Sequence, residues 1–379
     1  MEEQSVFSEL PEALVEEMLE KSNQIGEEIL LMFKELKEKK KEIREQLQKS
    51  GMLKNDRELE FPQPPTTCGV DGSYAIEKLM AMDLVGCAAV AVEGLTPPFE
   101  TRHWEAPKHL TFMAHEKRDD DTPSIVRGIM IQMELELAVN APHDIVMLDG
   151  SFTTPIIYMN QAVTKAKEKN TDIIEELIKR FESFLMAYRT VLEASKSDKI
   201  WVSLPKYTTR QELGKSLGWA SHYDDRALMT FILSAGEYTT PIPLEKPIGK
   251  WHLASPKDDQ KLDRVIDEIT SLLEKIHVVY YKPHSWMPAL RLEIPSSVAT
   301  NKSRLSILFQ GLRYQCGTAG IMEPYPLFMA DRMVKHLGSA MPAFRQASTR
   351  RIIELYDEKD FSEIFFTMHG YRTEGGSLG

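Results

Sequence analysis

Two segments of the same design place the strongest constraint on how this chain folds: VDGS at 70–73 and LDGS at 148–151. In each, an apolar stretch typical of a buried strand runs into an aspartate, and the turn-forming pair Gly-Ser follows. One such segment indicates little more than a turn. Two of them, after two buried strands, predict that Asp71 and Asp149 end neighbouring strands of an α/β sheet, at the edge where such sheets bind ligands.

Predicted strands and helices alternate along the rest of the chain. Residues 68–93 predict a hairpin with a wide connection, and further apolar strands are expected at 143–151, 199–204, 276–281 and 289–294. Helical patterns cover 124–140, 160–196 and 302–356, whereas the apolar run 228–233 fits a helix or a strand. This order predicts an α/β domain with a mixed sheet flanked by helices.

Residues 8–50 predict one long helix ahead of this domain. Its apolar residues form a heptad-like stripe, and Glu and Lys fill most other positions. The stripe consists of Met18, Ile25, Ile29, Met32, Leu36 and Ile43. Prolines in FPQPPTT, at 61–67, end the helical region. We therefore expect a helical segment over 1–60 that docks a second copy or a partner, and a domain over 61–379 with a helical insertion at about 160–196.

The composition excludes several classes of protein. The longest apolar run, 84–92, is about half of the ~20 residues that a membrane-spanning helix needs. The acidic, polar start does not resemble a signal peptide. Three distant cysteines without a CxxC pair argue against a zinc ribbon or a disulfide scaffold and fit a reducing cytoplasm. The motifs of P-loop, dinucleotide-binding, zinc-protease and serine-hydrolase proteins are absent from the sequence.

The charge balance limits how the chain can hold nucleic acid. With 46 Lys+Arg against 57 Asp+Glu, the formal net charge is −11. Proteins that hold DNA or RNA by electrostatics alone usually have a basic surface. We therefore expect any contact with nucleic acid to be local, mediated by a metal, or supplied by a partner.

The two aspartates predict a metal site, because adjacent carboxylates repel one another unless a cation lies between them. Mg²⁺ or Mn²⁺ calls for a third oxygen ligand. The predicted helix 124–140 offers two: Glu134 at the edge of its apolar arc, and Glu136 well outside it. We prefer Glu134, with Glu136 as the alternative. Asp71, Glu134 and Asp149 then have the form of a phosphodiesterase centre, in which cations activate water and stabilise the leaving oxygen.

At these residues the sequence resembles the NurA nuclease family. The resemblance covers about 68–335 and rests on VDGSY at 70–74, LDGSF at 148–152 after an acidic helix, WVSLPK at 201–206 and PYPLFMAD at 324–331. It implies an RNase H-like fold with added helices and a homodimer. It also implies a Mn²⁺-dependent (or Mg²⁺-dependent) DNase with single-strand endonuclease and 5′→3′ exonuclease activities. The implied partner is HerA, a hexameric DNA-translocating ATPase, in DNA end processing for repair or phage defence.

The resemblance also implies roles for particular residues. Asp71, Glu134 and Asp149 match the metal-binding acids of the family. The late motif of the family commonly reads GYPYPLxxAH, and its first Tyr and final His assist catalysis. This chain has Glu323 and Asp331 at those two positions, and an acid at 331 is a candidate fourth ligand. Lys206 follows a predicted strand and is either a phosphate contact or a surface lysine.

Two other functions fit the sequence. One is a non-catalytic assembly or regulatory subunit of the ATPase complex, because Glu323 and Asp331 depart from the family motif. The other is an RNase H-like nuclease that acts on RNA or on hybrids, since the substrate is not encoded in the three acids. A motor that encircles and feeds the DNA is consistent with a nuclease of net charge −11.

Overall fold

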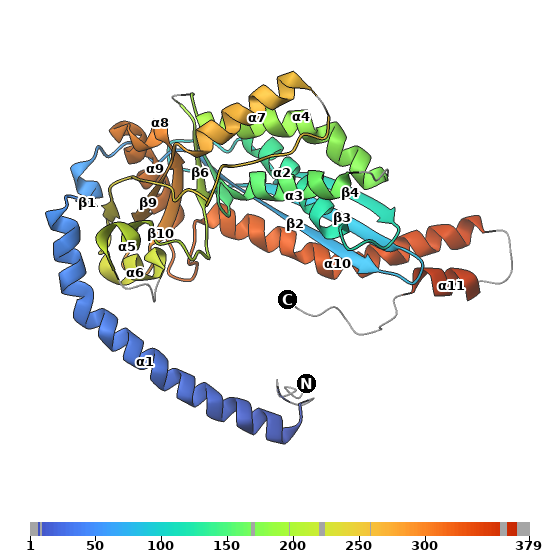
Figure 1. Ribbon diagram of the computed structural model, residues 1–379, viewed down its shortest axis with the longest axis horizontal. Coiled ribbons are helices and arrows are strands. Elements are labelled where there is room, and N and C mark those ends of the chain that lie inside the picture. The colour runs from blue at the N-terminus through green and yellow to red at the C-terminus, as the bar shows by residue number, and fades with distance from the viewer. Residues whose placement is uncertain are drawn as a thin grey trace.

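A mixed sheet of ten strands runs through the protein (Figure 1). The computed structural model describes residues 7, 10–167, 171–196, 198–219, 224–257, 259–356 and 362–369. The strands are β1 (Leu53–Asn55), β2 (Thr67–Lys78), β3 (Asp83–Glu93), β4 (Lys108–Glu116), β5 (Ile145–Asp149), β6 (Ile200–Leu204), β7 (Glu237–Thr239), β8 (Ile242–Pro243), β9 (Ile276–Tyr281) and β10 (Leu290–Pro295). Their order is β1-β7-β9-β10-β6-β5-β2-β3-β4, and β8 pairs with β9.

The centre of this sheet has the arrangement of an RNase H-like core. Strands β2, β3 and β4 form an antiparallel meander, and β5 and β6 continue the sheet parallel to β2. Strand β10 then pairs antiparallel with β6 and extends the sheet towards β1. This confirms the predicted mixed α/β fold.

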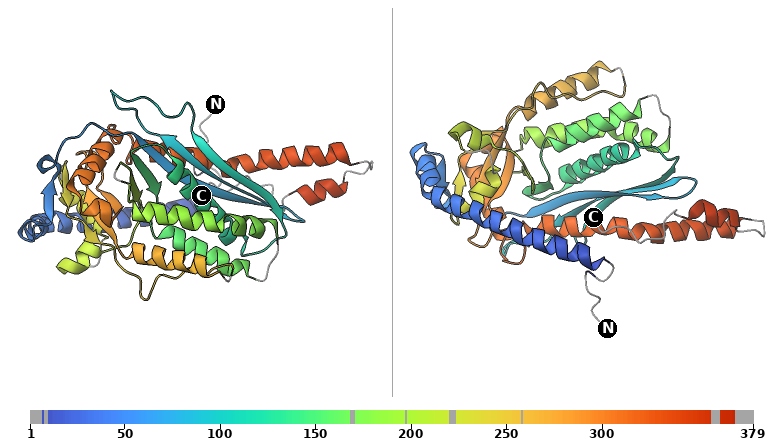
Figure 2. Two further views of the ribbon diagram at one scale, coloured as in Figure 1. Left: turned by 90° about the horizontal axis from the view of Figure 1, so that it is seen from above. Right: turned by 60° about the horizontal axis from the view of Figure 1, so that its bottom comes forward.

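Helices cover both faces of the sheet (Figure 2). They are α1 (Glu12–Lys49), α2 (Thr122–Asn140), α3 (Thr154–Ala166), α4 (Asp172–Glu193), α5 (Glu212–Leu217), α6 (Asp225–Ile232), α7 (Gln260–Leu273), α8 (Ser296–Ala299), α9 (Lys302–Gln315), α10 (Tyr325–Leu355) and α11 (Ser362–Met368), with a 3₁₀ turn at Asp56–Glu58. Helices α2, α3, α4 and α7 stack on one side of β2 and β3, and α10 crosses the other side.

Strand β5 shows why the sheet needs helices on both faces. Its residues alternate between the two hydrophobic clusters: Val146 and Leu148 belong to the cluster that includes α2 and α4, whereas Ile145 and Met147 belong to the one that includes α9. A strand that is apolar on both faces is buried on both faces. The predicted apolar strands at 199–204, 276–281 and 289–294 are confirmed as β6, β9 and β10, and the run 228–233 lies mostly in helix α6.

The prediction that Asp71 ends its strand is wrong. Strand β2 continues for seven residues beyond Asp71, and every residue from Cys68 to Lys78 pairs with β3. The predicted wide connection is wrong for the same reason, because only residues 79–82 separate the two strands. Pairing along the whole length of β3 outweighs the local turn preference of Gly72-Ser73. Asp149 does end its strand, and Gly150 follows in the left-handed region at φ 77°.

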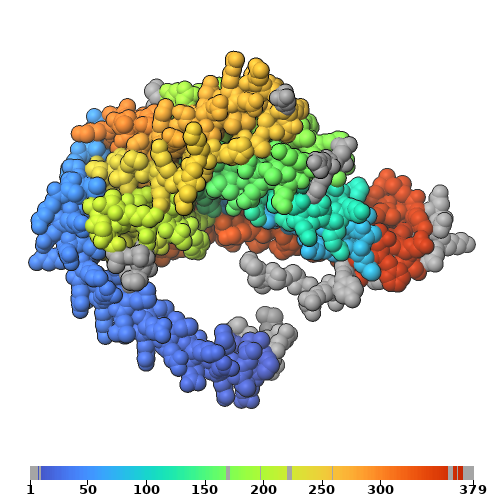
Figure 3. Space-filling model, in the orientation of Figure 1, coloured from blue at the N-terminus to red at the C-terminus, as the bar shows by residue number. Residues whose placement is uncertain are grey.

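Helix α1 leaves the body of the protein as an arm (Figure 3). Only its C-terminal part is buried, through Leu36, Ile43 and Leu47, and it contacts α6 there. The rest of the predicted apolar stripe is exposed: Met18, Ile25, Ile29 and Met32. The predicted helix start at residue 8 lies outside the described residues, as do positions 1–6 and 370–379 of the two predicted segments.

Candidate functional site

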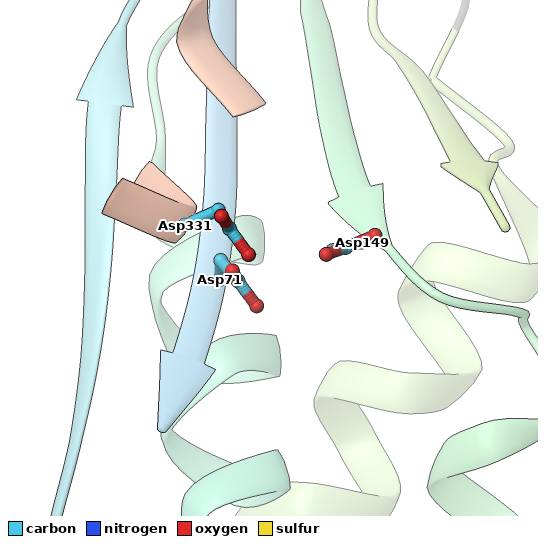
Figure 4. Close-up of side chains that lie close together, drawn as sticks. All are labelled: Asp71, Asp149 and Asp331. Carbon is cyan, nitrogen blue, oxygen red and sulfur yellow. The ribbon is translucent and has the colours of Figure 1, made fainter. Parts of the chain in front are cut away.

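Three aspartates from distant parts of the sequence meet where β2, β5 and the first turns of α10 come together (Figure 4). Asp71, Asp149 and Asp331 each offer a carboxylate oxygen, and these oxygens lie within 4.8 Å of one another. Asp71 and Asp149 are neighbours because β2 and β5 run parallel, with Val70 paired to Leu148 one residue earlier. Asp331 comes from α10, nearly 200 residues further along the chain.

Gly69 allows α10 to approach β2 closely enough for Asp331 to join the group. A Cβ on Gly69 would lie 2.4 Å from the backbone carbonyl carbon of Pro326, a distance that real side chains do not adopt. Any larger residue at 69 would therefore push the start of α10 away from the sheet. Gly69 thus acts as the spacer that sets the position of Asp331.

Gly72 makes room for Glu134 in the same way. A Cβ on Gly72 would lie 2.4 Å from Glu134 Oε1 and 2.8 Å from Met130 Cγ. The glycine that suggested a turn in the sequence therefore serves close packing between β2 and α2.

Of the two candidate glutamates, Glu134 faces the aspartates. Its side chain is buried, and burial, Asp71 and Asp149 raise the pKa of its carboxyl well above the usual range. Glu136 points elsewhere, with its side chain 42% exposed and paired to Arg180 at 3.2 Å. Among the described residues, the group within 4.8 Å contains Asp331 where we expected Glu134. The role of Glu134 as a ligand stays a prediction.

Each strand aspartate uses one oxygen locally. Asp71 Oδ1 accepts a hydrogen bond from the Gly72 amide, and Asp149 Oδ1 accepts one from the Gly150 amide, both at 2.8 Å. Burial, together with the charges of Asp149 and Asp331, raises the pKa of Asp71 to about 7. A group of carboxylate oxygens that repel one another in this way suits a hard divalent cation such as Mg²⁺ or Mn²⁺.

Lys206 reaches into the same site from just beyond β6. Its Nζ lies 3.0 Å from Asp149 Oδ2, 3.0 Å from Glu323 Oε2 and 3.6 Å from Asp331 Oδ1. Burial lowers the pKa of this amine, but Asp149 and Glu323 raise it more, so the net pKa lies above the usual range. Lys206 is therefore an ion-paired member of the site and not a solvated surface lysine.

Glu323 and Asp331 thus both contribute to the site, although in different ways. Glu323 contacts Lys206, and burial raises the pKa of its carboxyl while Lys206 opposes that shift. Asp331 lies beside Asp71 and also pairs with Lys335 at 2.7 Å, on the solvent side of α10. The sequence carried no sign that Lys335 approaches the site, other than its helical spacing of four from Asp331.

A buried ion network behind Asp149 escaped the sequence analysis. Arg291 donates to both oxygens of Glu212, at 2.7 and 2.9 Å, and to Glu293 Oε1 at 3.0 Å. The other Glu293 oxygen accepts from the Ser151 hydroxyl at 2.7 Å and the Phe152 amide at 2.9 Å. The network therefore holds the turn that follows Asp149. Its signal was visible as charged residues inside the apolar strand ALRLEI.

An open cavity of about 630 Å³ adjoins Lys206 on the side away from β2. Its lining carries three basic side chains and six hydroxyls: Lys206, Arg210, Arg226, Ser151, Thr153, Tyr207, Thr208, Thr209 and Thr230. Two acids, Asp224 and Glu293, also line it, so this is a polar surface with a small excess of basic side chains on a chain of net charge −11. Among the described residues as a whole, no helix is both long enough and apolar enough to cross a membrane.

Comparison with known proteins identifies the family. The sequence model of the NurA domain matches residues 65–336. The chain belongs to the NurA family. The matched range includes Lys206 and the five candidate site acids Asp71, Glu134, Asp149, Glu323 and Asp331, and the match confirms the predicted resemblance. A comparison with curated proteins finds no match.

Solved NurA structures share the fold of this chain. The NurA nuclease from Sulfolobus solfataricus is 14% identical and superposes with a TM-score of 0.60, over 93% of this chain and 100% of that one. A NurA crystal structure with manganese is 14% identical, with a TM-score of 0.55 over 88% of this chain and 99% of that one. A NurA structure bound to dAMP and manganese is 14% identical, with a TM-score of 0.50 over 88% and 98%.

Proposed function

We propose that this NurA-family chain is a metal-dependent deoxyribonuclease, a phosphodiester hydrolase. The observation that carries the proposal is the convergence of Asp71, Asp149 and Asp331 within 4.8 Å, with buried Glu134 beside them. Relatives of the same fold support it, since they are described as a nuclease and as complexes with manganese and with dAMP.

Asp71, Glu134 and Asp149 would hold Mn²⁺ or Mg²⁺, with Asp331 as a further ligand. The fit rests on the donors, which are all carboxylate oxygens, and on the burial and the charges of Asp149 and Asp331 that together raise the pKa of Asp71. A cation bound there supplies Lewis-acid chemistry: it lowers the pKa of a bound water and stabilises charge on the phosphate. Gly72 and Gly150 fix the strand aspartates through their amides, and Glu323 holds Lys206 where its ammonium can contact a phosphate oxygen.

For the substrate we propose DNA, cut as single strands by endonuclease and 5′→3′ exonuclease activities. The cavity beside Lys206 supports this, because a volume of about 630 Å³ suits a nucleotide or two rather than a duplex. Its three basic side chains give the local contact that the net charge of −11 calls for.

We further propose a homodimer that works with a HerA-type hexameric ATPase in the cytoplasm, in DNA end processing for repair or phage defence. The exposed apolar stripe of α1 supports a docking role for the segment 1–60, because exposed apolar patches mark interaction surfaces. An ATPase that delivers the DNA would also make a long basic groove unnecessary.

A non-catalytic regulatory subunit is the second candidate. It is favoured by Lys206, whose ammonium already pairs with Asp149, Glu323 and Asp331 and offsets part of their negative charge without a metal. In that case Asp71, Glu134, Asp149, Glu323 and Asp331 would serve the fold alone.

A cleavage assay separates the two candidates. The purified protein is incubated with 5′- or 3′-labelled single- and double-stranded DNA and RNA, in Mn²⁺, Mg²⁺ or EDTA, with and without the cognate ATPase. We expect Mn²⁺-dependent cleavage of single-stranded DNA that Asp149→Asn abolishes, with the label reporting the polarity. No cleavage under any condition, the ATPase included, would favour the regulatory subunit.

A further inference from the structure

Lys206 occupies a place that is unusual for a lysine. Its side chain is only 25% exposed, and its ammonium lies between carboxylates from β5, from Glu323 two residues before α10, and from α10 itself. Two of the three distances are 3.0 Å, well within the separation of an ion pair. The ammonium is therefore a largely enclosed part of the site and not an exposed group at its surface.

The strand order decides on which side of Asp149 the ammonium lies. Across the sheet, β5 stands between β2, which carries Asp71, and β6, which leads into Lys206. Asp149 thus faces Asp71 on one side and Lys206 on the other. The gap between Asp71 and Asp149, which Asp331 also borders, lies on the first side; the ammonium contacts Glu323 and lies 3.6 Å from Asp331 Oδ1.

In a centre with two cations about 4 Å apart, a carboxylate that lies between the cations can bind both. Asp149 is the acid in the middle, and both of its oxygens are engaged: Oδ1 by the Gly150 amide and Oδ2 by Lys206. A second divalent ion on the Glu323 side would have to displace the ammonium from Asp149 and from Glu323. Glu323, half-buried at 20% side-chain exposure, is ion-paired with Lys206 in this position.

We infer that Lys206 takes the place of a second cation, so that the site binds one divalent ion and the lysine supplies the other positive charge. The inference rests on the proposed function and deepens it. The ion would belong among Asp71, Asp149 and Asp331, with Glu134 beside them, and Glu323 would anchor the ammonium at the mouth of the cavity that Lys206 lines. A phosphate oxygen that enters from this cavity meets the ammonium first.

Counting bound Mn²⁺ tests the inference without relying on activity. The full-length protein is dialysed to equilibrium against Mn²⁺, and Mn²⁺ bound by Asp149→Asn is subtracted as background. We expect one Mn²⁺ per chain for the wild type, and two for Lys206→Met, with an exchange-coupled Mn²⁺ pair in its electron paramagnetic resonance spectrum. Lys335→Met is the matched control, because it removes the other lysine that pairs with Asp331 and should still bind one Mn²⁺.

The outcomes distinguish this inference from the proposed function. Two Mn²⁺ ions per wild-type chain, or one in Lys206→Met, would overturn the inference and leave a metal-dependent nuclease standing. No Mn²⁺ in the wild type would overturn both. If Lys206→Met fails to fold, as judged by circular dichroism, the wild-type count still decides, together with Lys206→Arg, which keeps the charge and should bind one ion.

Discussion

Replacing Arg291 by Met should cost far more stability than the loss of an ordinary ion pair. The guanidinium is 1% exposed and makes four contacts within 3.0 Å: two with Glu212, one with Glu293 and one with the Tyr280 hydroxyl. Methionine fills similar volume, but it leaves two buried carboxylates without their cation. Removal of one partner from such a buried group costs about 3–5 kcal/mol, a large part of the 5–15 kcal/mol that is typical of whole domains.

The same substitution should also disturb the position of Asp149 in the functional site, because Glu293 holds the turn after Asp149 through Ser151 and Phe152. Urea unfolding followed by tryptophan fluorescence measures the loss of stability, and the midpoint of cleavage against Mn²⁺ concentration measures the disturbance at Asp149. Lys261→Met is the control. Its pair with Glu182 is exposed on both sides, at 72% and 61%, so we expect its loss to cost less than about 1 kcal/mol.

A loss below about 1 kcal/mol for Arg291→Met would refute this reasoning. It would mean that water reaches Glu212 and Glu293 at little cost when the guanidinium is gone, or that Glu212 accepts a proton. Since Arg291 holds the pKa of Glu212 below its usual range against the effect of burial, the destabilisation should also be larger at pH 8 than at pH 5. An equal loss at both pH values would contradict the electrostatic explanation.

Three further perturbations test other parts of the structure. Gly69→Ala should displace the start of α10 and lower the affinity for Mn²⁺ several-fold in a dialysis titration; unchanged affinity would show that α10 does not set the site. Glu134→Gln should abolish metal-dependent cleavage and Glu136→Gln should not; the reverse result would assign the ligand role to Glu136. Buried His143 has a pKa lowered to about 4, chiefly by burial, so it stays neutral when folded and takes up a proton when unfolded below pH 6.5. Stability should therefore fall by up to about 3 kcal/mol as the pH drops from 6.5 to 4, and His143→Gln should show a flatter curve in urea titrations; parallel curves would exclude this cause.

The sequence alone determined the features that depend on local periodicity. Apolar runs located the strands β5, β6, β9 and β10, and helical spacing placed Glu134 rather than Glu136 on the buried side of α2. Asp149 was correctly assigned to a strand end, because the sharp turn at Gly150 is a property of its own few residues. The motifs around 70–74, 148–152 and 324–331 were enough to indicate the family that the domain match confirms.

Only the tertiary structure decided which residues from distant parts of the sequence lie next to one another. The pairing of β2 with the whole of β3 kept Asp71 inside its strand, and the close approach of α10 over Gly69 brought in Asp331. Lys206 became part of the site because β6 runs parallel to β5, and Arg291 met its two glutamates across elements far apart in sequence. Such contacts arise when apolar surfaces pack and charged groups then find partners within a few ångströms. The spacing of residues along the chain does not encode these spatial distances, so no local sequence pattern could have predicted the contacts.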